Sequence, residues 1–173
     1  MAGNEYLLAA VEQAVLMCIR AFQKDRKVLL CGNGGSAADA QHIAAELSGK
    51  FKKDRAPLFA EALHVNTSYL TAVSNDYNFD YIYQRAVQAK GREGDVLIGL
   101  STSGNSQNII LALEEAQRKN MHTIILTGLT GGKMKPLGEI WIPIPSYDIG
   151  RIQEAHITIG HILCELIEQN MFP

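Results

Sequence analysis

Two short loops rich in glycine, serine and amide residues carry most of the chemical information in this sequence. The first, residues 31–36 (CGNGGS), follows the apolar run at 28–30, and the second, residues 101–106 (STSGNS), follows the apolar run at 96–100. A loop of this kind brings backbone N–H groups and side-chain hydroxyls together at a helix N-terminus, where they can bind an anion. Two such loops in one chain predict a pocket for a phosphorylated, hydroxyl-rich small molecule.

The second loop offers four hydroxyl groups whose type and spacing suit a phosphate group. These are the hydroxyls of Ser101, Thr102, Ser103 and Ser106. Each can donate a hydrogen bond to a phosphate oxygen, and the dipole of the helix predicted next adds a favourable field. A loop that binds a nucleoside triphosphate would carry Gly-Lys-Ser or Gly-Lys-Thr, which the sequence lacks. Hydrolysis of a nucleoside triphosphate is therefore not expected.

The first loop also matches the loose dinucleotide-binding pattern G-x-G-x-x-A at residues 32–37. A dinucleotide site further needs an acidic residue at the end of the second strand, where it binds a ribose hydroxyl. The strand predicted at 58–65 ends without one, and a dehydrogenase would have no use for the second loop. An NAD-dependent dehydrogenase is thus a weak alternative, and we expect no nucleotide cofactor.

Three side chains are candidates for acid–base or metal chemistry. His42 and Glu46 stand four residues apart in the helix predicted at 36–51, so they share one face. An imidazole and a carboxylate at this spacing can bind a divalent metal or act as an acid–base pair. Such a pair is more often a surface contact, but this helix points its first turns into the predicted pocket. His161 lies among isoleucines on the last predicted helix, so its residue neighbours alone favour a core histidine.

The elements that must position these residues alternate between helix and strand along the chain. Helical periodicity predicts helices at 5–24, 36–51, 67–73, 79–90, 106–119 and 151–171, with Ser36 as the N-cap of the second. Apolar runs predict strands at 28–31, 58–65, 95–100, 122–126 and 140–144. This alternation predicts an α/β fold, a doubly wound parallel sheet with an N-terminal helix and a long C-terminal helix. In such sheets ligands bind beyond the carboxyl ends of the strands, where both loops are expected.

Length and composition narrow the class of protein further. The 173 residues suffice for one domain, residues 1–173, and the net charge of −2 favours neither nucleic acid nor an acidic membrane as partner. The densest basic stretch, 52–55, is interrupted by an acid and predicts a solvated loop. Three widely spaced cysteines give no disulfide framework, and Cys18 and Cys164 are predicted core residues. Because there is no leader and no apolar run near the ~18 residues of a membrane span, we expect a cytoplasmic protein.

Six motifs in a fixed order resemble one known family. They are CGNGGS (31–36), DAQHIAAEL (39–47), SNDY (74–77), GREGDVLIG (91–99), STSGNS (101–106) and RIQEAH (151–156). From about residue 27 to the C-terminus the chain closely resembles the phosphoheptose isomerases of the sugar isomerase (SIS) domain family. The resemblance implies a flavodoxin-like, SIS-type sandwich. It also implies interconversion of sedoheptulose 7-phosphate and D-glycero-D-manno-heptose 7-phosphate, which leads to nucleotide-activated heptoses for lipopolysaccharide or other surface polysaccharides.

The resemblance also assigns roles to individual positions of this chain. The sugar would be contacted by Asn33, Gly34 and Gly35, and the phosphate by Ser101, Thr102, Ser103 and Ser106. Ser36, Asn75, Asp76 and Gln153 would also bind the substrate. Glu46 and His161 would be the catalytic pair, with Glu46 also contacting the substrate. One zinc ion per subunit would be held by His42, Glu46, Gln153 and His161. Lys50 stands where the family is expected to have arginine, and the N-terminal helix is shorter than expected for the family.

The chemistry expected of such an isomerase fits the candidate residues independently. Moving a proton between adjacent carbons through an enediol needs a base with a tuned pKa and an acid or Lewis acid at the carbonyl. Glu46 is the candidate base and His161 the candidate acid. A Glu46 bound tightly to zinc is a weaker base, so the metal is expected to be weakly held or to replace part of the proton shuttle. The alternative is a non-enzymatic SIS-fold regulator that binds a sugar phosphate or a protein, which would not need Glu46 and His161 in register.

The last predicted helix suggests how the chain assembles. Gln153 and His161 are eight residues apart, about 12 Å of rise and some 80° of rotation on a straight helix. Either Gln153 lies in a frayed first turn, or the two residues serve one site from different subunits. The helix is also apolar around much of its circumference, which is more than one sheet face requires. We therefore expect a homo-oligomer with active sites near subunit interfaces, and the family resemblance implies a tetramer.

Overall fold

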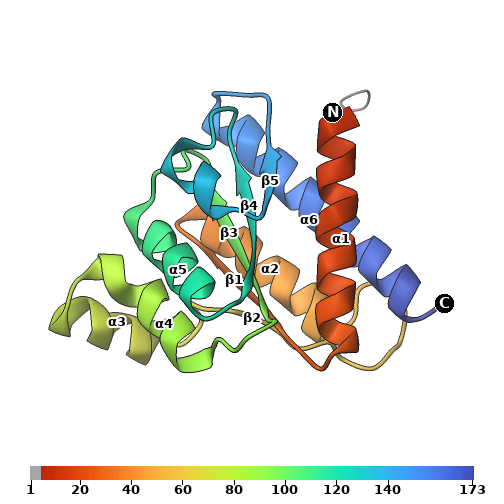
Figure 1. The fold of residues 1–173 in the computed structure, drawn as a ribbon, viewed down its shortest axis with the longest axis horizontal. Helices are drawn as coiled ribbons and strands as arrows, with labels where there is room; N and C mark the ends of the chain where they lie inside the picture. The colour runs from red at the N-terminus through yellow and green to blue at the C-terminus, as the bar shows by residue number, and fades with distance from the viewer. Residues whose placement is uncertain (1–4) are drawn as a thin grey trace.

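A five-stranded parallel sheet forms the centre of the molecule (Figure 1). The computed structural model describes residues 5–173. The strands are β1 (Val28–Gly32), β2 (Ala60–Ala62), β3 (Val96–Ser101), β4 (His122–Thr127) and β5 (Ile140–Pro143). They pair in the order β2-β1-β3-β4-β5, each pair parallel. The order reverses between β1 and β3, which confirms the doubly wound α/β prediction.

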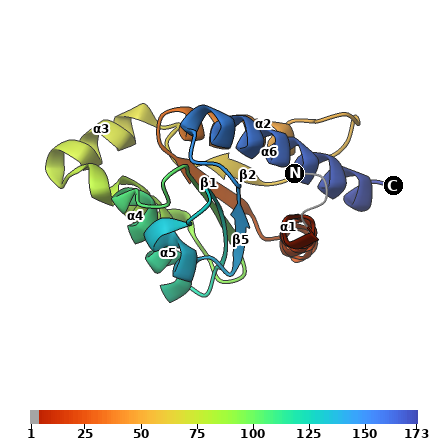
Figure 2. The ribbon, with the colours of Figure 1, turned by 90° about the horizontal axis from the view of Figure 1, so that it is seen from above.

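Helices cover both faces of this sheet, as Figure 2 shows from above. One face carries α1 (Glu5–Gln23), α2 (Gly35–Ser48) and α6 (Ile149–Met171), and the other carries α3 (Thr67–Asp76), α4 (Ile82–Lys90) and α5 (Gln107–Arg118). Alternate strand residues supply the two cores. In β1, Val28 and Leu30 pack under α1, α2 and α6, whereas Leu29 and Cys31 pack under α4 and α5. This two-sided burial explains why the strand sequences are continuous apolar runs.

The N-terminal helix packs against α6 and β5 of its own chain. Cys18 of α1 and Cys164 of α6 lie in the same core cluster and are buried, which confirms their prediction as core residues. Burial raises the pKa of each of these thiols to about 12, so both remain protonated at neutral pH. Within residues 5–173, no helix is both long and apolar enough to cross a membrane.

Several element boundaries differ from the predictions. The strand predicted at 58–65 is only Ala60–Ala62, because an edge strand pairs on one side and just three residues reach β1. The helix predicted at 79–90 is split into a 3-10 turn, η1 (Phe79–Tyr81), and α4. Here the side chain of Asn78 accepts a hydrogen bond from the N–H of Asp80 and starts a separate turn. A second 3-10 segment, η2 (Gly132–Leu137), contains a proline and was not predicted.

The prediction that Ser36 caps α2 is wrong. The helix starts at Gly35, its N-cap is Gly34, and no side chain makes a capping hydrogen bond there. Gly34 has a φ of 55°, which a glycine reaches without strain, so the chain enters the helix earlier than a serine cap would allow. Ser36 is consequently buried inside the first turn.

The prediction of a solvated loop at 52–55 is wrong for Arg55, whose side chain is only 2% exposed. Its Nε donates to Glu168 of α6 at 2.9 Å, and Glu168 also accepts the backbone N–H groups of Phe51, Lys52 and Lys53. Burial alone would raise the pKa of Glu168, but these four donors lower it below its usual value. The loop after α2 is therefore fastened to the C-terminal helix.

Candidate active site

Both predicted anion-binding loops lie at the carboxyl edge of the sheet, on either side of the point where the strand order reverses. β1 and β3 run side by side as far as the pair Gly32–Leu100, and the first and second loops follow directly. This is where a doubly wound sheet places its ligands. A hollow of about 440 Å³ lies at the other end of the strands, between α1 and the first residues of β4 and β5. None of the residues that line it is a predicted site residue.

The second loop holds its hydroxyls in two different environments. The hydroxyls of Ser101 and Ser106 bond each other at 2.9 Å, and Ser101 also accepts the N–H of Gly104 at 3.2 Å. Thr102 and Ser103 instead border a hollow of about 270 Å³ that reaches the start of α6. Within residues 5–173 the hydroxyl of Thr102 makes no hydrogen bond, so it is available to a ligand.

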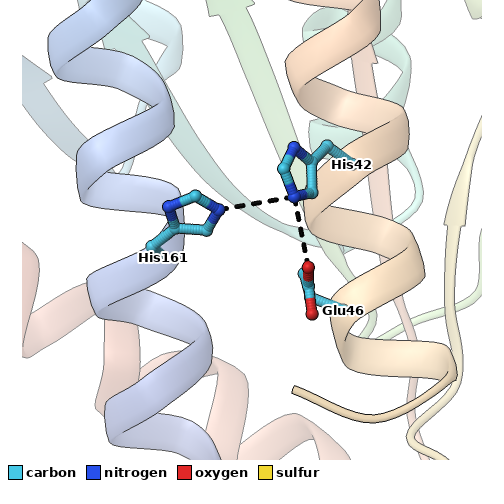
Figure 3. Close-up of side chains that lie close together, drawn as sticks. All are labelled: His42, Glu46 and His161. Carbon is cyan, nitrogen blue, oxygen red and sulfur yellow. Dashed lines mark hydrogen bonds and ion pairs between the residues drawn. The ribbon is translucent and has the colours of Figure 1, made fainter. Parts of the chain in front are cut away.

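Helices α2 and α6 bring three candidate side chains together (Figure 3). His42 Nε2 lies 3.1 Å from a carboxylate oxygen of Glu46, one turn further along α2. His161 Nε2 comes from α6 and lies 3.4 Å from the same His42 nitrogen. The predicted shared face of His42 and Glu46 is confirmed, and the cluster shows that His161 is not simply a core histidine.

The donor atoms of this cluster could hold a metal ion, and their types and spacing can be compared with those of a zinc site. One nitrogen or oxygen from each of His42, Glu46 and His161 lies within 4.8 Å of the others. Tetrahedral zinc with Zn–N bonds of about 2.0–2.1 Å would hold two ring nitrogens roughly 3.3–3.4 Å apart. The observed nitrogen–nitrogen distance is 3.4 Å. Two imidazole nitrogens and one carboxylate oxygen are also ligands that zinc accepts, which leaves a fourth position open.

Two contacts fix the cluster in place. A Cβ on Gly160 would lie 2.5 Å from the Cδ1 of Ile43, so any larger residue here would require the buried Ile43 side chain or the α2–α6 packing to shift. The ring of Phe51 stacks on His161, with centroids 5.8 Å apart and an interplanar angle of 24°. Because Glu168 fastens the backbone of Phe51, the loop after α2 covers one side of the His161 ring.

Gln153 lies at the other end of the α2–α6 contact. A Cβ on Gly35 would be 2.6 Å from its Nε2, so the amide rests against the first residue of α2. α6 begins at Ile149, and the side chain of Asp148 caps it by accepting the N–H of Arg151. Gln153 therefore lies inside a regular helix, and the alternative of a frayed first turn is wrong.

Asn75 and Asp76 are not brought to this cluster within the chain. They end α3, are exposed and bond each other at 3.1 Å. Both views show α3 at the opposite end of the molecule from α1 (Figure 1, Figure 2). The first loop differs from expectation too, because the side-chain amide of Asn33 pairs with Asn108.

Comparison with known proteins decides the family. The SIS domain family matches residues 3–128. The phosphoheptose isomerase of a Nitratiruptor species is 52% identical over 96% of this chain and 89% of that protein. The chain belongs to the phosphoheptose isomerases. The structure of the phosphoheptose isomerase from Neisseria gonorrhoeae superposes on this chain with a TM-score of 0.89 at 44% identity, covering 94% of this chain and 87% of that one. The phosphoheptose isomerase structure from Francisella tularensis superposes with a TM-score of 0.90 at 40% identity, covering 93% of this chain and 86% of that one.

Membership of the phosphoheptose isomerases confirms the resemblance drawn from the six motifs. It makes the protein an enzyme of the SIS type rather than a dehydrogenase. Two buried polar residues of this phosphoheptose isomerase fold, Asn108 and His156, were not assigned a role from sequence. Asn108 could have been noticed, since it stands one turn before Ala112 on the buried stripe of α5, where an amide needs a partner.

His156 lies in the core of this phosphoheptose isomerase fold with neither ring nitrogen hydrogen-bonded within residues 5–173. Burial lowers its pKa to about 4, and the nearby carbonyl of Thr127 only partly opposes this. The unfolded chain binds a proton near pH 6.5, so stability is complete above that pH and declines as the pH falls toward 4. The expected loss is about 3 kcal/mol of unfolding free energy.

Urea unfolding of metal-free protein at several pH values measures this loss. The variant His156→Gln cannot titrate, so its stability should fall less steeply between pH 6.5 and 4 than that of the unmodified protein. Equal slopes for the two proteins would show that His156 is already charged in the folded state.

Proposed function

We propose that this enzyme interconverts sedoheptulose 7-phosphate and D-glycero-D-manno-heptose 7-phosphate by an enediol-type proton transfer. The observation that carries the proposal is the cluster of His42, Glu46 and His161 in a chain of this family, whose two predicted anion-binding loops follow β1 and β3. In the cytoplasm such a reaction would supply precursors of nucleotide-activated heptoses. Substrate and product are isomers, so the reaction needs no oxidant, reductant or nucleotide cofactor.

The carboxylate of Glu46 is the proposed base. It removes a proton from C1 of the ketose and returns it to C2 of the enediol, which gives the aldose. His161 is the proposed acid: it gives a proton to the C2 carbonyl oxygen as the enediol forms, and it takes a proton from the C1 hydroxyl as the enediol becomes the aldose. The stacked ring of Phe51 and the edge-on ring of His42 hold the His161 imidazole in a defined orientation, as proton transfer in both directions requires.

The residues that would hold zinc, one ion per subunit, are His42, Glu46, His161 and Gln153. A bound zinc ion would polarise the carbonyl oxygen as a Lewis acid. Glu46 is a weaker base when it is tightly coordinated, so the proposal includes a weakly held ion. The Gln153 amide, two turns before His161 on α6, would have to reach the same site from its place at Gly35, or from a neighbouring subunit.

The substrate is proposed to lie across the two loops. Its phosphate would be bound by Ser101, Thr102, Ser103 and Ser106, and its sugar by the first loop at residues 33–36. Thr102 and Ser103 border the open hollow, so they are the hydroxyls best placed to donate to an incoming phosphate.

A homotetramer is the proposed assembly, with residues 1–173 acting as one SIS domain in each subunit. Asn75 and Asp76 lie away from the cluster of their own chain, so a contact with substrate would come from a neighbouring copy. Ile162 of α6 and Leu8 and Leu16 of α1 are exposed apolar side chains on the helices that would meet. Sedimentation that shows a fully active monomer would contradict this assembly.

The proposed reaction is tested by incubating the protein with sedoheptulose 7-phosphate and detecting the aldose product. A parallel incubation with a chelator, followed by addition of zinc, tests the metal. Turnover that is lost with the chelator and restored by zinc supports a functional metal site. Absence of any aldose would overturn the proposed reaction, and turnover unaffected by the chelator would remove the metal from it.

Replacing Thr102 or Ser103 with alanine is expected to act mainly through KM. Each change removes a hydrogen bond to a charged phosphate, worth roughly 1.5–3 kcal/mol, or about 10- to 150-fold in affinity. Steady-state kinetics with sedoheptulose 7-phosphate measures the effect, and the control is Thr130→Ala, a hydroxyl residue of the same hollow that is not among the proposed phosphate ligands. If both variants bind phosphorylated and unphosphorylated sugar as the unmodified protein does, the phosphate lies elsewhere.

A further inference from the structure

Two asparagines join the first loop to the helix that follows the second. Asn33 Nδ2 donates to Asn108 Oδ1 at 2.9 Å, and Asn108 Nδ2 donates back to Asn33 Oδ1 at 2.9 Å. Each amide thus satisfies a donor and an acceptor of the other. We call this pair the amide bridge. Asn108 is only 2% exposed, so its amide is shielded from solvent and depends on Asn33 for its partners.

The sheet itself does not hold the two loops together. β1 and β3 are paired up to Gly32 and Leu100, and beyond that point the chains separate toward opposite faces. α2 leaves the first loop for the face that carries α1 and α6, whereas α5 leaves the second loop for the face that carries α4. The amide bridge spans this divergence in the crevice where the strand order reverses.

Each loop has one further contact beside the bridge. The hydroxyl of Tyr83 in α4 donates to the carbonyl of Gly32, and the hydroxyls of Ser101 and Ser106 bond each other. The first of these contacts ties the start of the first loop to α4, and the second fixes the shape of the second loop, but neither joins one loop to the other. The amide bridge instead fixes the distance and angle between the first loop and the helix that closes the second.

We propose that Asn108 is a positioning residue of the active site, which acts through Asn33 to hold the sugar-binding loop in register with the phosphate-binding loop. A sugar phosphate must reach both loops at once, so their relative placement decides how the reacting carbons lie against Glu46. A misplacement on the order of 1 Å can lower a rate about 100-fold. The inference rests on the proposed function, because it assigns sugar and phosphate to different loops.

The test compares Asn108→Ala, Asn33→Ala and the double variant. For each we measure kcat, KM and affinity for sedoheptulose 7-phosphate by calorimetry, and affinity for inorganic phosphate, which needs the second loop alone. Asn108→Ala is expected to lower kcat/KM on the order of 10- to 100-fold, with phosphate affinity changed less than about threefold. The double variant should be no worse than the poorer single variant, because either change breaks the same bridge. Gln107→Ala is the matched control, since Gln107 is the exposed neighbour of Asn108 on α5.

Three results would overturn the inference. Multiplicative losses in the double variant would mean that Asn33 and Asn108 act separately. An equal loss of phosphate affinity would mean that the second loop itself has collapsed. Lower thermal stability with unchanged kcat/KM and unchanged affinity would mean a purely structural role.

Failure of the proposed function gives a different result. In that case the unmodified protein makes no aldose. The effect of the bridge can still be measured, by comparing the ratio of affinities for sedoheptulose 7-phosphate and inorganic phosphate between the unmodified protein and Asn108→Ala. If Asn108→Ala does not fold, Asn108→Asp, which keeps the size of the side chain but removes the Nδ2 donor to Asn33, is measured in its place.

Discussion

Replacing Glu46 with glutamine is expected to abolish turnover of sedoheptulose 7-phosphate while leaving sugar-phosphate binding largely intact. Glutamine has nearly the same shape as glutamate but cannot accept the proton that the isomerisation moves. The loss should therefore appear in kcat, by at least the ~10²- to 10⁴-fold typical of a general base. Steady-state kinetics measures the rate, and calorimetry with the sugar phosphate measures binding.

A matched control for this experiment is Glu154→Gln on the outer face of α6. Glu154 is exposed and pairs with Arg151 at 2.7 Å, so its loss should leave kcat unchanged. Zinc content is measured for both variants, since Glu46 is also a proposed ligand. A Glu46→Gln protein with near-native kcat would remove Glu46 from the mechanism. A Glu46→Gln protein that has lost both metal and rate, and recovers the rate in excess zinc, would make Glu46 a ligand rather than the base.

The second large effect is expected for stability, from Glu168→Ala. This change leaves the Arg55 guanidinium buried without its carboxylate and removes the acceptor of three backbone N–H groups. Breaking one side of a buried ion pair costs about 3–5 kcal/mol, which is a large part of the stability of a domain this size. Urea denaturation measures the change in unfolding free energy.

Glu165→Ala is the control, because Glu165 forms an exposed ion pair with Lys52 at 2.7 Å that should contribute only about 0–1 kcal/mol. The lowered pKa of Glu168 adds a pH test. A depressed carboxyl pKa stabilises the fold above about 4.5, and this contribution disappears as the pH falls below that value. Equal stabilities of Glu168→Ala and Glu165→Ala would show that the Arg55 pair contributes nothing.

The sequence predicted the fold class and the location of the loops because both depend on short-range patterns. Helical and strand periodicity is local, and a run such as 96–100 indicates a strand covered on both faces whatever its neighbours are. The i, i+4 spacing of His42 and Glu46 is equally local, and the structure confirms their shared face. The ends of the helices and strands were predicted less well. A cap such as the one at Gly34 depends on the local backbone conformation, and the residue type limits that conformation without determining it.

Tertiary structure alone decided how the site is assembled, because its contacts join residues far apart in the chain. His42 and His161 are 119 positions apart, and they meet only where Gly160 lets α6 approach α2. The amide bridge joins residues 75 positions apart, and Arg55 reaches Glu168 across 113. The local periodicity of the sequence does not predict such long-range side-chain contacts, since each depends on how the helices pack over the sheet. Residue types thus indicated which side chains were available for chemistry, whereas packing determined which of them stand together.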